Sequence, residues 1–312
     1  AFSIERLEGM LYSVRQLNAQ AFADVKRELT QELRDVAQYE AAWNQAVLAD
    51  VLPAKIMAVG VSVDQVAAAA LSRPFQGNLL KGFLSELEEK KARLIRQAVA
   101  DGFVQGKTTA DIVRSIRGTK AKGYSDGIIE ITRRDAQAIV RTALSHTAAA
   151  ATRKTHEANS DLIKGFVWLA TLDEKTSSPC RIRDHKQYDK AFRPIGHSFP
   201  WGAGPGAFHW NCRSKSTPIL KSLKEITGLD IEDFEIDERA SMDGVVPGAT
   251  DYATWIKKQS AARQDDILGK KRGELLRKGD LSLADLYSAK GSPLTLDQLR
   301  ERHAAAFKKA GL

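Results

Sequence analysis

The sequence has few cysteines and no long apolar run, and each shortage excludes a class of protein. Two cysteines in 312 residues are too few for a secreted disulfide scaffold, so we expect synthesis in a reducing, intracellular compartment. The chain contains no run of about 18 apolar residues, which predicts that no segment spans a membrane. It also lacks a basic-then-apolar leader, so we expect no secretory signal.

The charge is moderately positive. The chain carries 47 basic and 39 acidic residues, for a net charge of +8. This excess permits contact with nucleic acid or with an acidic protein surface, and it requires neither. A hydrophobic content of 43% is sufficient for real cores, and 312 residues allow two domains or one elongated domain.

Helical periodicity dominates the first half of the chain. Apolar residues recur every three or four positions through residues 4–50, which predicts one long amphipathic helix. Its apolar stripe needs a partner helix, from the same chain or from a neighbouring subunit. The same periodicity predicts helices over residues 64–70, 78–100 and 132–158. No repeat period is visible.

The segment GKTTADIVRSIRG invites comparison with a phosphate-binding P-loop. That motif requires four residues between its first glycine and the Gly-Lys pair, whereas Gly102 leaves three. A predicted helix, not a strand, precedes it. We therefore expect a short helix here, capped by Thr108 or Thr109 and ending at Gly118.

The character of the sequence changes near residue 163. The stretch GFVWLATL is rich in β-branched and aromatic residues and predicts a strand. Prolines and glycines then punctuate residues 179–206, which predicts a loop-rich module with few strands. A module this small has little core of its own and often needs a cross-link, such as a disulfide or a structural metal, to be stable.

The C-terminal part is mixed and basic. An acidic stretch, DIEDFEIDE, precedes a segment over residues 251–287 that is predicted to be helical and strongly basic in its middle. Thr295 and Gln298 have the spacing of a reciprocal helix cap. The residues expected to contact DNA phosphates or a protein partner are Lys257, Lys258, Lys270, Lys271 and Arg272.

These patterns predict a mainly α-helical protein, with an elongated helical N-terminal part, a small loop-rich α+β module and C-terminal helices. We divide the chain into four segments, which are long amphipathic docking helices at 1–104, further helices at 105–162, the Cys/His module at 163–220, and a mixed, basic helical segment at 221–312.

Both cysteines and three of the six histidines lie between residues 180 and 212. His209 and Cys212 have the HxxC spacing that lets two ligands meet one ion, and Cys180 is the obvious third ligand. A structural zinc site needs a fourth ligand, for which the candidates are Asp184, His185 and His197. Three other readings stay open: buried thiols, a disulfide, or a catalytic Cys–His pair.

Two stretches of the module resemble a known family. TLDEKTSSPCRIRD and FHWNCRS resemble the core motif of the phage head-morphogenesis family, the minor head proteins of tailed phages, including the Mu-like ones. AIVRTALSHTAAAA resembles the Arg-Thr helix of that family, and residues 252–286 resemble its C-terminal segment. The resemblance covers roughly residues 105–300. The matching residues are Arg141, Thr142, Thr171, Asp173, Lys175, Thr176, Cys180, Arg183, Asp184, His209, Asn211, Cys212 and Arg213.

The sequence departs from the family at two metal-ligand positions. Many members carry cysteine where this chain has Ser177 and Ser214, so they have two thiolates more than this chain. We expect polar hydrogen bonds to replace the missing ligands. Asp173, Thr176 and Arg183 are expected to tie the strand to the HWNCR turn, since charge-assisted hydrogen bonds are the strong ones.

The resemblance implies a structural minor capsid protein that is made in the host cytoplasm and located in the virion, in the head interior or at the portal vertex. Its implied partners are the portal protein and the major capsid or scaffold proteins, with possible non-specific contact to packaged DNA and none to a membrane. Zinc is the only cofactor that the residues suggest. No catalytic residues are assigned, and the enzymatic alternative is a processing protease or other phage enzyme that uses Cys180 and His209 during head assembly.

Overall fold

The computed structural model describes residues 4–52, 56–105, 107–227, 238–288 and 291–312, and the protein is mainly helical, as predicted. It divides into two compact units. The helical unit comprises residues 1–43, 61–151 and 209–211, and the sheet unit comprises residues 44–60, 152–208 and 212–312. The acidic stretch DIEDFEIDE lies almost entirely outside the described residues.

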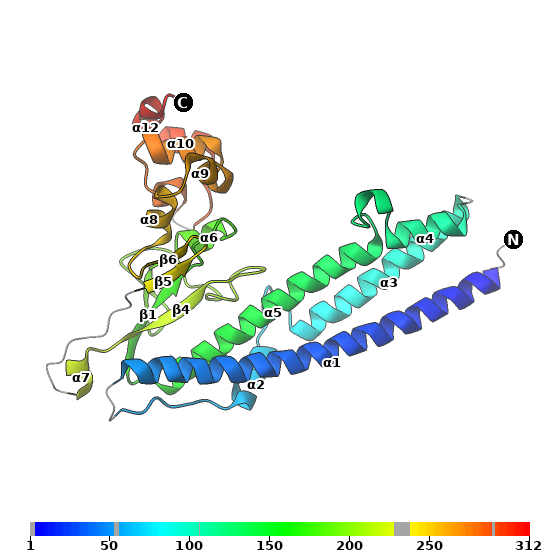
Figure 1. The fold of residues 1–312 in the computed structure, drawn as a ribbon, viewed down its shortest axis with the longest axis horizontal. Helices are drawn as coiled ribbons and strands as arrows, with labels where there is room; N and C mark the ends of the chain where they lie inside the picture. Colours follow the sequence, from blue (N-terminus) through cyan, green and yellow to red (C-terminus); the bar gives the residue numbers. More distant parts are fainter. Residues whose placement is uncertain (1–3, 53–55, 106, 228–237, 289–290) are drawn as a thin grey trace. The chain divides into compact units, whose positions relative to one another are not determined.

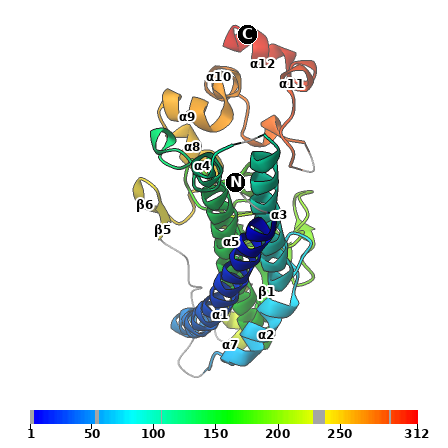
Figure 2. The same cartoon turned by 90° about the vertical axis from the view of Figure 1, so that its right-hand side faces the viewer.

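Long helices make up the helical unit, where they run alongside one another (Figures 1 and 2). The helices are α1 (Ile4–Val51), α2 (Val63–Ser72), α3 (Leu80–Val104), α4 (Thr109–Arg117), a short 3-10 turn η1 (Lys120–Lys122) and α5 (Ile128–Ala158). α1 extends into the sheet unit at its end, and α5 does so at its last turns. The predicted helices are therefore confirmed, with ends that move by a few residues.

The apolar stripe of α1 packs within its own chain. Leu29 and Leu33 are buried against Leu84 of α3 and Ile139 of α5, in one aliphatic cluster. The partner helices thus come from the same chain at this part of the stripe. Most charged residues of α1 face solvent.

The GKTT segment forms a helix cap, as its failed P-loop spacing predicted. The Thr108 side chain accepts a hydrogen bond from the Asp111 backbone N–H at the start of α4. Gly118 ends the helix with φ of +94°, a left-handed conformation that favours glycine. A Cβ at Gly118 would also meet the carbonyl oxygen of Tyr124 at 2.6 Å.

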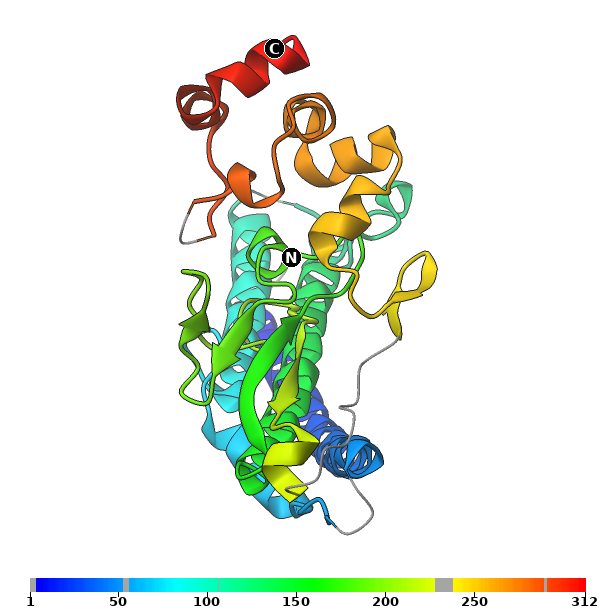
Figure 3. The same cartoon turned by 90° about the vertical axis from the view of Figure 1, so that its left-hand side faces the viewer.

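A four-stranded antiparallel sheet lies at the centre of the sheet unit (Figure 3). Its strands are β1 (Ile163–Leu169), β2 (Gln187–Asp189), β3 (Pro194–Ile195) and β4 (Lys215–Leu220), in the order β3-β2-β1-β4. Gly165 sits mid-strand in β1, where a Cβ would meet the Tyr188 carbonyl oxygen at 2.4 Å. The central strand can therefore approach β2 only with glycine at this position.

A hairpin and several short helices complete the sheet unit. They are α6 (Ser178–Arg181), α7 (Leu223–Thr227), β5 (Glu238–Ser241), β6 (Gly244–Pro247), α8 (Tyr252–Lys257), α9 (Ala261–Leu268), α10 (Lys270–Lys278), η2 (Ala284–Leu286), α11 (Leu296–Arg302) and α12 (Ala304–Ala310). The basic segment is thus three short helices, separated by Lys258–Ser260 and by Gly269 with φ of +84°. The predicted reciprocal cap of Thr295 and Gln298 is confirmed at α11.

The largest apolar core joins these C-terminal helices to the segment after β1. Leu172 and Ile182 pack with buried residues of α8, α10 and α11, among them Trp255, Leu275 and Leu299. None of the described helices combines the length and apolar character needed to cross a bilayer.

Candidate metal centre and its polar surroundings

The two cysteines lie side by side in the interior of the sheet unit. Cys180 belongs to α6, and Cys212 lies in the loop just before β4. Both side chains are buried. Their sulfur atoms are 3.9 Å apart, well beyond the roughly 2.05 Å of a disulfide bond. The two side chains are therefore thiols, in a cluster with the rings of Trp168 and Tyr188.

His209 precedes Cys212 by three residues in the same turn. His209 belongs to the helical unit and the two cysteines belong to the sheet unit, so the structure brings together Cys180 and Cys212 within one unit. The His209 ring hydrogen-bonds through Nδ1 to the Trp210 carbonyl oxygen at 2.8 Å. A carbonyl can only accept, so Nδ1 carries a proton.

The environment of the thiols favours their protonated form in the absence of a cation. The hydrogen bond to Cys212 and burial both raise the pKa of Cys180 strongly. The hydroxyls of Ser214 and Ser177 hydrogen-bond to Cys180 and counter part of this rise. A catalytic thiolate has a lowered pKa and partial exposure, whereas Cys180 has neither.

A buried arginine lies beside this cluster. The Arg183 side chain is 1% exposed and donates to the carbonyl oxygens of Pro179 and Pro200, at 2.7 and 3.1 Å. Its guanidinium lies 4.5 Å from the centre of the Phe208 ring, within cation–π range. Burial lowers the pKa of Arg183, and the neighbouring Tyr188 and Cys180 oppose that effect. Arg183 thus fixes the loop over the thiols rather than the HWNCR turn itself.

Two candidates for a fourth ligand, Asp184 and His185, lie in a different cluster of the sheet unit. Asp184 accepts hydrogen bonds from the backbone N–H groups of Ala170 and Tyr252, both at 2.7 Å. It also pairs with Arg239, and the His185 ring contacts the same guanidinium through Nε2 at 2.9 Å. Asp184 and His185 therefore both contact Arg239. The third candidate, His197, contacts the Gln187 carbonyl oxygen at 2.9 Å.

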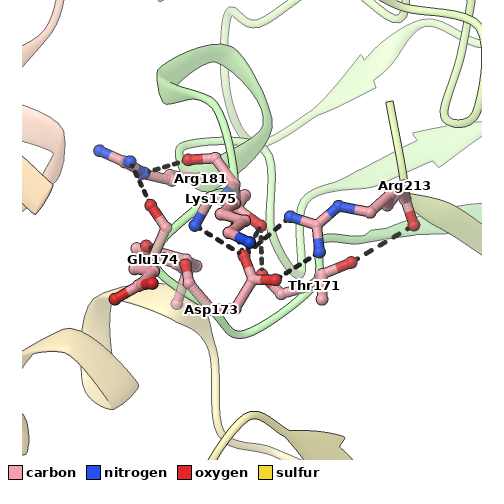
Figure 4. Close-up of polar contacts among 8 residues, drawn as sticks. Thr171, Asp173, Glu174, Lys175, Arg181 and Arg213 are labelled. Carbon is pink, nitrogen blue, oxygen red and sulfur yellow. Dashed lines mark hydrogen bonds and ion pairs between the residues drawn. The ribbon is translucent and has the colours of Figure 1, made fainter. Parts of the chain in front are cut away.

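The polar residues expected from the family resemblance form a network in the segment after β1 (Figure 4). Asp173 and Arg213 form a two-point ion pair, in which one of the bonds is 2.9 Å, and Thr171 donates to the Arg213 carbonyl oxygen. The Thr176 hydroxyl and backbone N–H both donate to Asp173. Burial alone would raise the pKa of Asp173, but the bonds from Arg213 and Thr176 outweigh it and lower the pKa.

The Arg-Thr pair of α5 also contacts the HWNCR turn, inside the helical unit. The Asn211 backbone N–H donates to the Thr142 hydroxyl at 3.0 Å, and Arg141 donates to the Asn211 side-chain oxygen at 3.1 Å. Asn211 has φ of +56°, a conformation that asparagine tolerates better than most residues. The Trp210 ring lies edge-on to Phe83 at 5.0 Å.

Two arginines in the polar surroundings were not predicted. Arg181 donates to the carbonyl oxygens of Thr176 and Ile267 and so ties the motif loop to α9, as Figure 4 shows in part. Arg239 holds the β5–β6 hairpin to Ala170 and Asp184. The pattern RIRD, with arginines on both sides of one isoleucine, is a signal for Arg181, but nothing in the sequence marks Arg239.

The predicted DNA-contact residues divide into two groups. Lys257, Lys258, Lys270 and Lys271 are exposed on α8–α10. Arg272 is half-buried and donates to the Leu294 carbonyl oxygen at 2.6 Å, so it takes part in the fold.

Comparison with known proteins finds no match. No family model, curated protein or solved structure matches this chain.

Proposed function

We propose that this chain is a structural minor head protein of a tailed bacteriophage, present in few copies and assembled near the portal vertex. The Asp173–Arg213 ion pair carries the proposal. It links TLDEKT to HWNCR, the two halves of the segment that resembles the head-morphogenesis family, across 40 positions of the chain. The two halves of the motif thus bind one another in the fold, which supports a structural role for them.

The thiol environment supports a structural role over a protease. A cysteine nucleophile needs a thiolate within reach of substrate. Cys180 is 2% exposed, and the hydrogen bond to Cys212 together with burial raises its pKa. In the structural role, Cys180 stabilises the module and performs no turnover.

The exposed side of α1 suits a docking role on a helix of the portal protein. Tyr39 and Trp43 are stacked with ring centres 6.5 Å apart, and they remain 66% and 54% exposed. Aromatic side chains one helical turn apart are typical anchors for helix-in-groove binding. Contact with packaged DNA is assigned to the exposed lysines of α8–α10, through phosphates and without sequence preference.

The decisive experiment is quantitative mass spectrometry of purified procapsids, full heads and ghosts left after ejection. A few to a few tens of intact copies per particle are expected. A Tyr39→Ala/Trp43→Ala variant should enter particles in lower number, while Val113→Ala, a matched exposed apolar change on α4, should enter normally. Absence of the wild-type chain from every particle would overturn the proposal.

DNA contact has a separate test. Lys270→Glu/Lys271→Glu changes only exposed residues, whereas a change of Arg272 would also disturb the fold. The double variant should bind DNA more weakly, and its affinity should depend less steeply on salt concentration. An unchanged salt dependence would exclude these lysines as phosphate contacts.

A further inference from the structure

A pocket lies between three short helices of the sheet unit. Helices α8, α9 and α10, with the turn after α10, enclose a cavity of about 450 Å³, which is within the range of small-ligand sites. Its lining residues are Lys257, Gln264, Leu276, Arg277, Asp280 and Leu281. Gln264 and both leucines are buried, whereas Lys257 and Asp280 are exposed. The pocket therefore combines a fixed interior with charged side chains that reach solvent.

Neighbouring residues hold Arg277 in one orientation. Its Nη1 group donates to the Gln264 side-chain oxygen at 3.1 Å and to the Asp265 carboxylate at 2.8 Å. Gln264 is 3% exposed and is fixed in turn, because its amide nitrogen donates to backbone carbonyl oxygens at 3.0 Å. Gly273 leaves room for this arrangement, since a Cβ there would lie 2.8 Å from the Nη1 atom of Arg277. The guanidinium is therefore in place before a ligand arrives.

Two groups of the pocket keep their donors unused. Within the described residues, Arg277 donates through Nη1 alone, so its Nε and Nη2 groups make no hydrogen bond there. The Lys257 ammonium makes neither a hydrogen bond nor an ion pair with any described residue. The Nε–Nη2 edge of a guanidinium carries parallel N–H groups, which bind two oxygens of one phosphate or carboxylate. Lys257 can add a point charge to the same anion.

The charges at the pocket leave one positive unit uncompensated. Asp265 pairs with Arg277, and Asp280 pairs with Lys309, so Lys257 is the cation without a counter-charge among the described residues. A nucleic-acid backbone carries one negative charge per phosphodiester, which equals this excess. The exposed lysines of α8–α10 continue the positive charge outside the pocket. The pocket is therefore suited to a singly charged phosphate group.

We propose that this pocket binds one phosphate group, which Arg277 holds by its Nε–Nη2 edge and Lys257 neutralises. The single charge favours a phosphodiester of duplex DNA over a free phosphate compound. The DNA source rests on the DNA contact proposed above, whereas the phosphate site itself does not. Such a contact fixes the position of a DNA backbone without reading its sequence.

The test uses the full chain and two probes, inorganic phosphate and a short DNA duplex. Both probes should shift the NMR signal of the Arg277 Nε–H group. Lys257→Gln should weaken the binding of both probes roughly tenfold, because one charge-assisted contact is lost. It should also reduce the slope of log DNA affinity against log salt concentration by about 0.9. Lys308→Gln is the matched control, an exposed lysine of α12 outside the pocket, and should bind both probes as wild type.

A second variant separates a guanidinium fork from general attraction between charges. Arg277→Lys keeps the charge and loses the fork, so it should weaken phosphate binding about tenfold. Lys257 makes no contact with the described fold, so Lys257→Gln keeps the proposal testable if Arg277→Lys misfolds. An Arg277 signal that neither probe moves would overturn the site, as would unchanged binding of both probes by Lys257→Gln.

The two probes also separate the phosphate site from the DNA contact. If Lys257→Gln weakens only phosphate binding, the site stands and its ligand is a free phosphate compound, so the DNA source is overturned. If the wild-type chain binds phosphate but no DNA, the site likewise stands and the proposed DNA contact fails. If DNA binding depends on Lys270 and Lys271 but neither probe depends on Lys257, the site fails and the proposed DNA contact stands.

Discussion

The two units of this protein bury their interiors by different means. The helical unit packs aliphatic side chains of α1, α3 and α5 against one another, and its ion pairs lie at the surface. The sheet unit instead buries the arginines Arg181 and Arg183 and the ion pair Asp184–Arg239, and fixes them to backbone carbonyls or to a carboxylate. A loop-rich module without long helices must satisfy many backbone groups, and arginine can reach several of them at once.

The largest expected effect is the loss of the buried ion pair. The side chains of Asp184 and Arg239 are 1% and 11% exposed, and Asp184 also accepts two backbone hydrogen bonds. Asp184→Asn should lower the free energy of unfolding by about 4 kcal/mol, because it leaves the Arg239 charge buried without its counter-charge. Urea unfolding followed by tryptophan fluorescence measures this. A loss below about 1 kcal/mol would show that water reaches the pair.

In the helical unit, the corresponding test is a substitution that leaves a cavity in the aliphatic cluster. Leu84 is 5% exposed and packs in the aliphatic cluster with Leu29 and Leu33. Leu84→Ala should cost about 3 kcal/mol in the free energy of unfolding, from lost burial and the space left behind. The exposed Val113→Ala on α4 should cost under about 0.5 kcal/mol. Equal costs for the two changes would contradict the packing described for this unit.

A buried histidine should make the stability of the sheet unit depend on pH. His156 is 5% exposed, and burial lowers its pKa to about 4 from an ordinary 6.5. The contribution of His156 to the free energy of unfolding is therefore complete above pH 6.5. It is lost as the pH falls towards 4, because over that range only the unfolded chain takes up the proton. Between pH 7.5 and 5 the wild-type chain should lose about 2 kcal/mol more stability than His156→Gln. Parallel pH profiles for the two chains would show that His156 is protonated in the fold.

The smallest effect is expected at the surface of the helical unit. Lys90 and Asp135 form an ion pair at 2.7 Å, with side chains 45% and 39% exposed. Asp135→Asn should change the free energy of unfolding by less than about 1 kcal/mol, and added salt should remove even that difference. It is the matched control for Asp184→Asn, since the chemical change is the same and only the burial differs. A cost as large as that at Asp184 would remove burial as the explanation.

The two units also differ in how much of them the sequence predicts. Helix periodicity predicts α1, α3, α4 and α5 because their stripes and caps depend on residues three or four positions apart. The basic segment was predicted as helical, but the break at Gly269 depends on a backbone conformation that periodicity does not encode.

In the candidate site, the sequence predicts His209 and Cys212 as ligands from their spacing, and the structure places Cys180 beside Cys212. The place of Asp184 depends on Arg239, 55 positions later in the chain, and on the backbone of Tyr252. No local pattern connects residues so far apart, so the sequence placed Asp184 and His185 among the metal-ligand candidates, while the structure places them around a guanidinium.

The position of β1 at the centre of its sheet has a consequence for the order of events during synthesis. Its neighbour β2 follows about 20 positions later, β4 follows about 50 positions later, and the arginine that closes over Asp184 follows later still. The ribosome therefore exposes an unpaired, apolar β1 well before its second edge can be covered, whereas the backbone hydrogen bonds of α1 join residues only four positions apart. A slower-elongating ribosome would lengthen the interval in which the second edge of β1 is exposed.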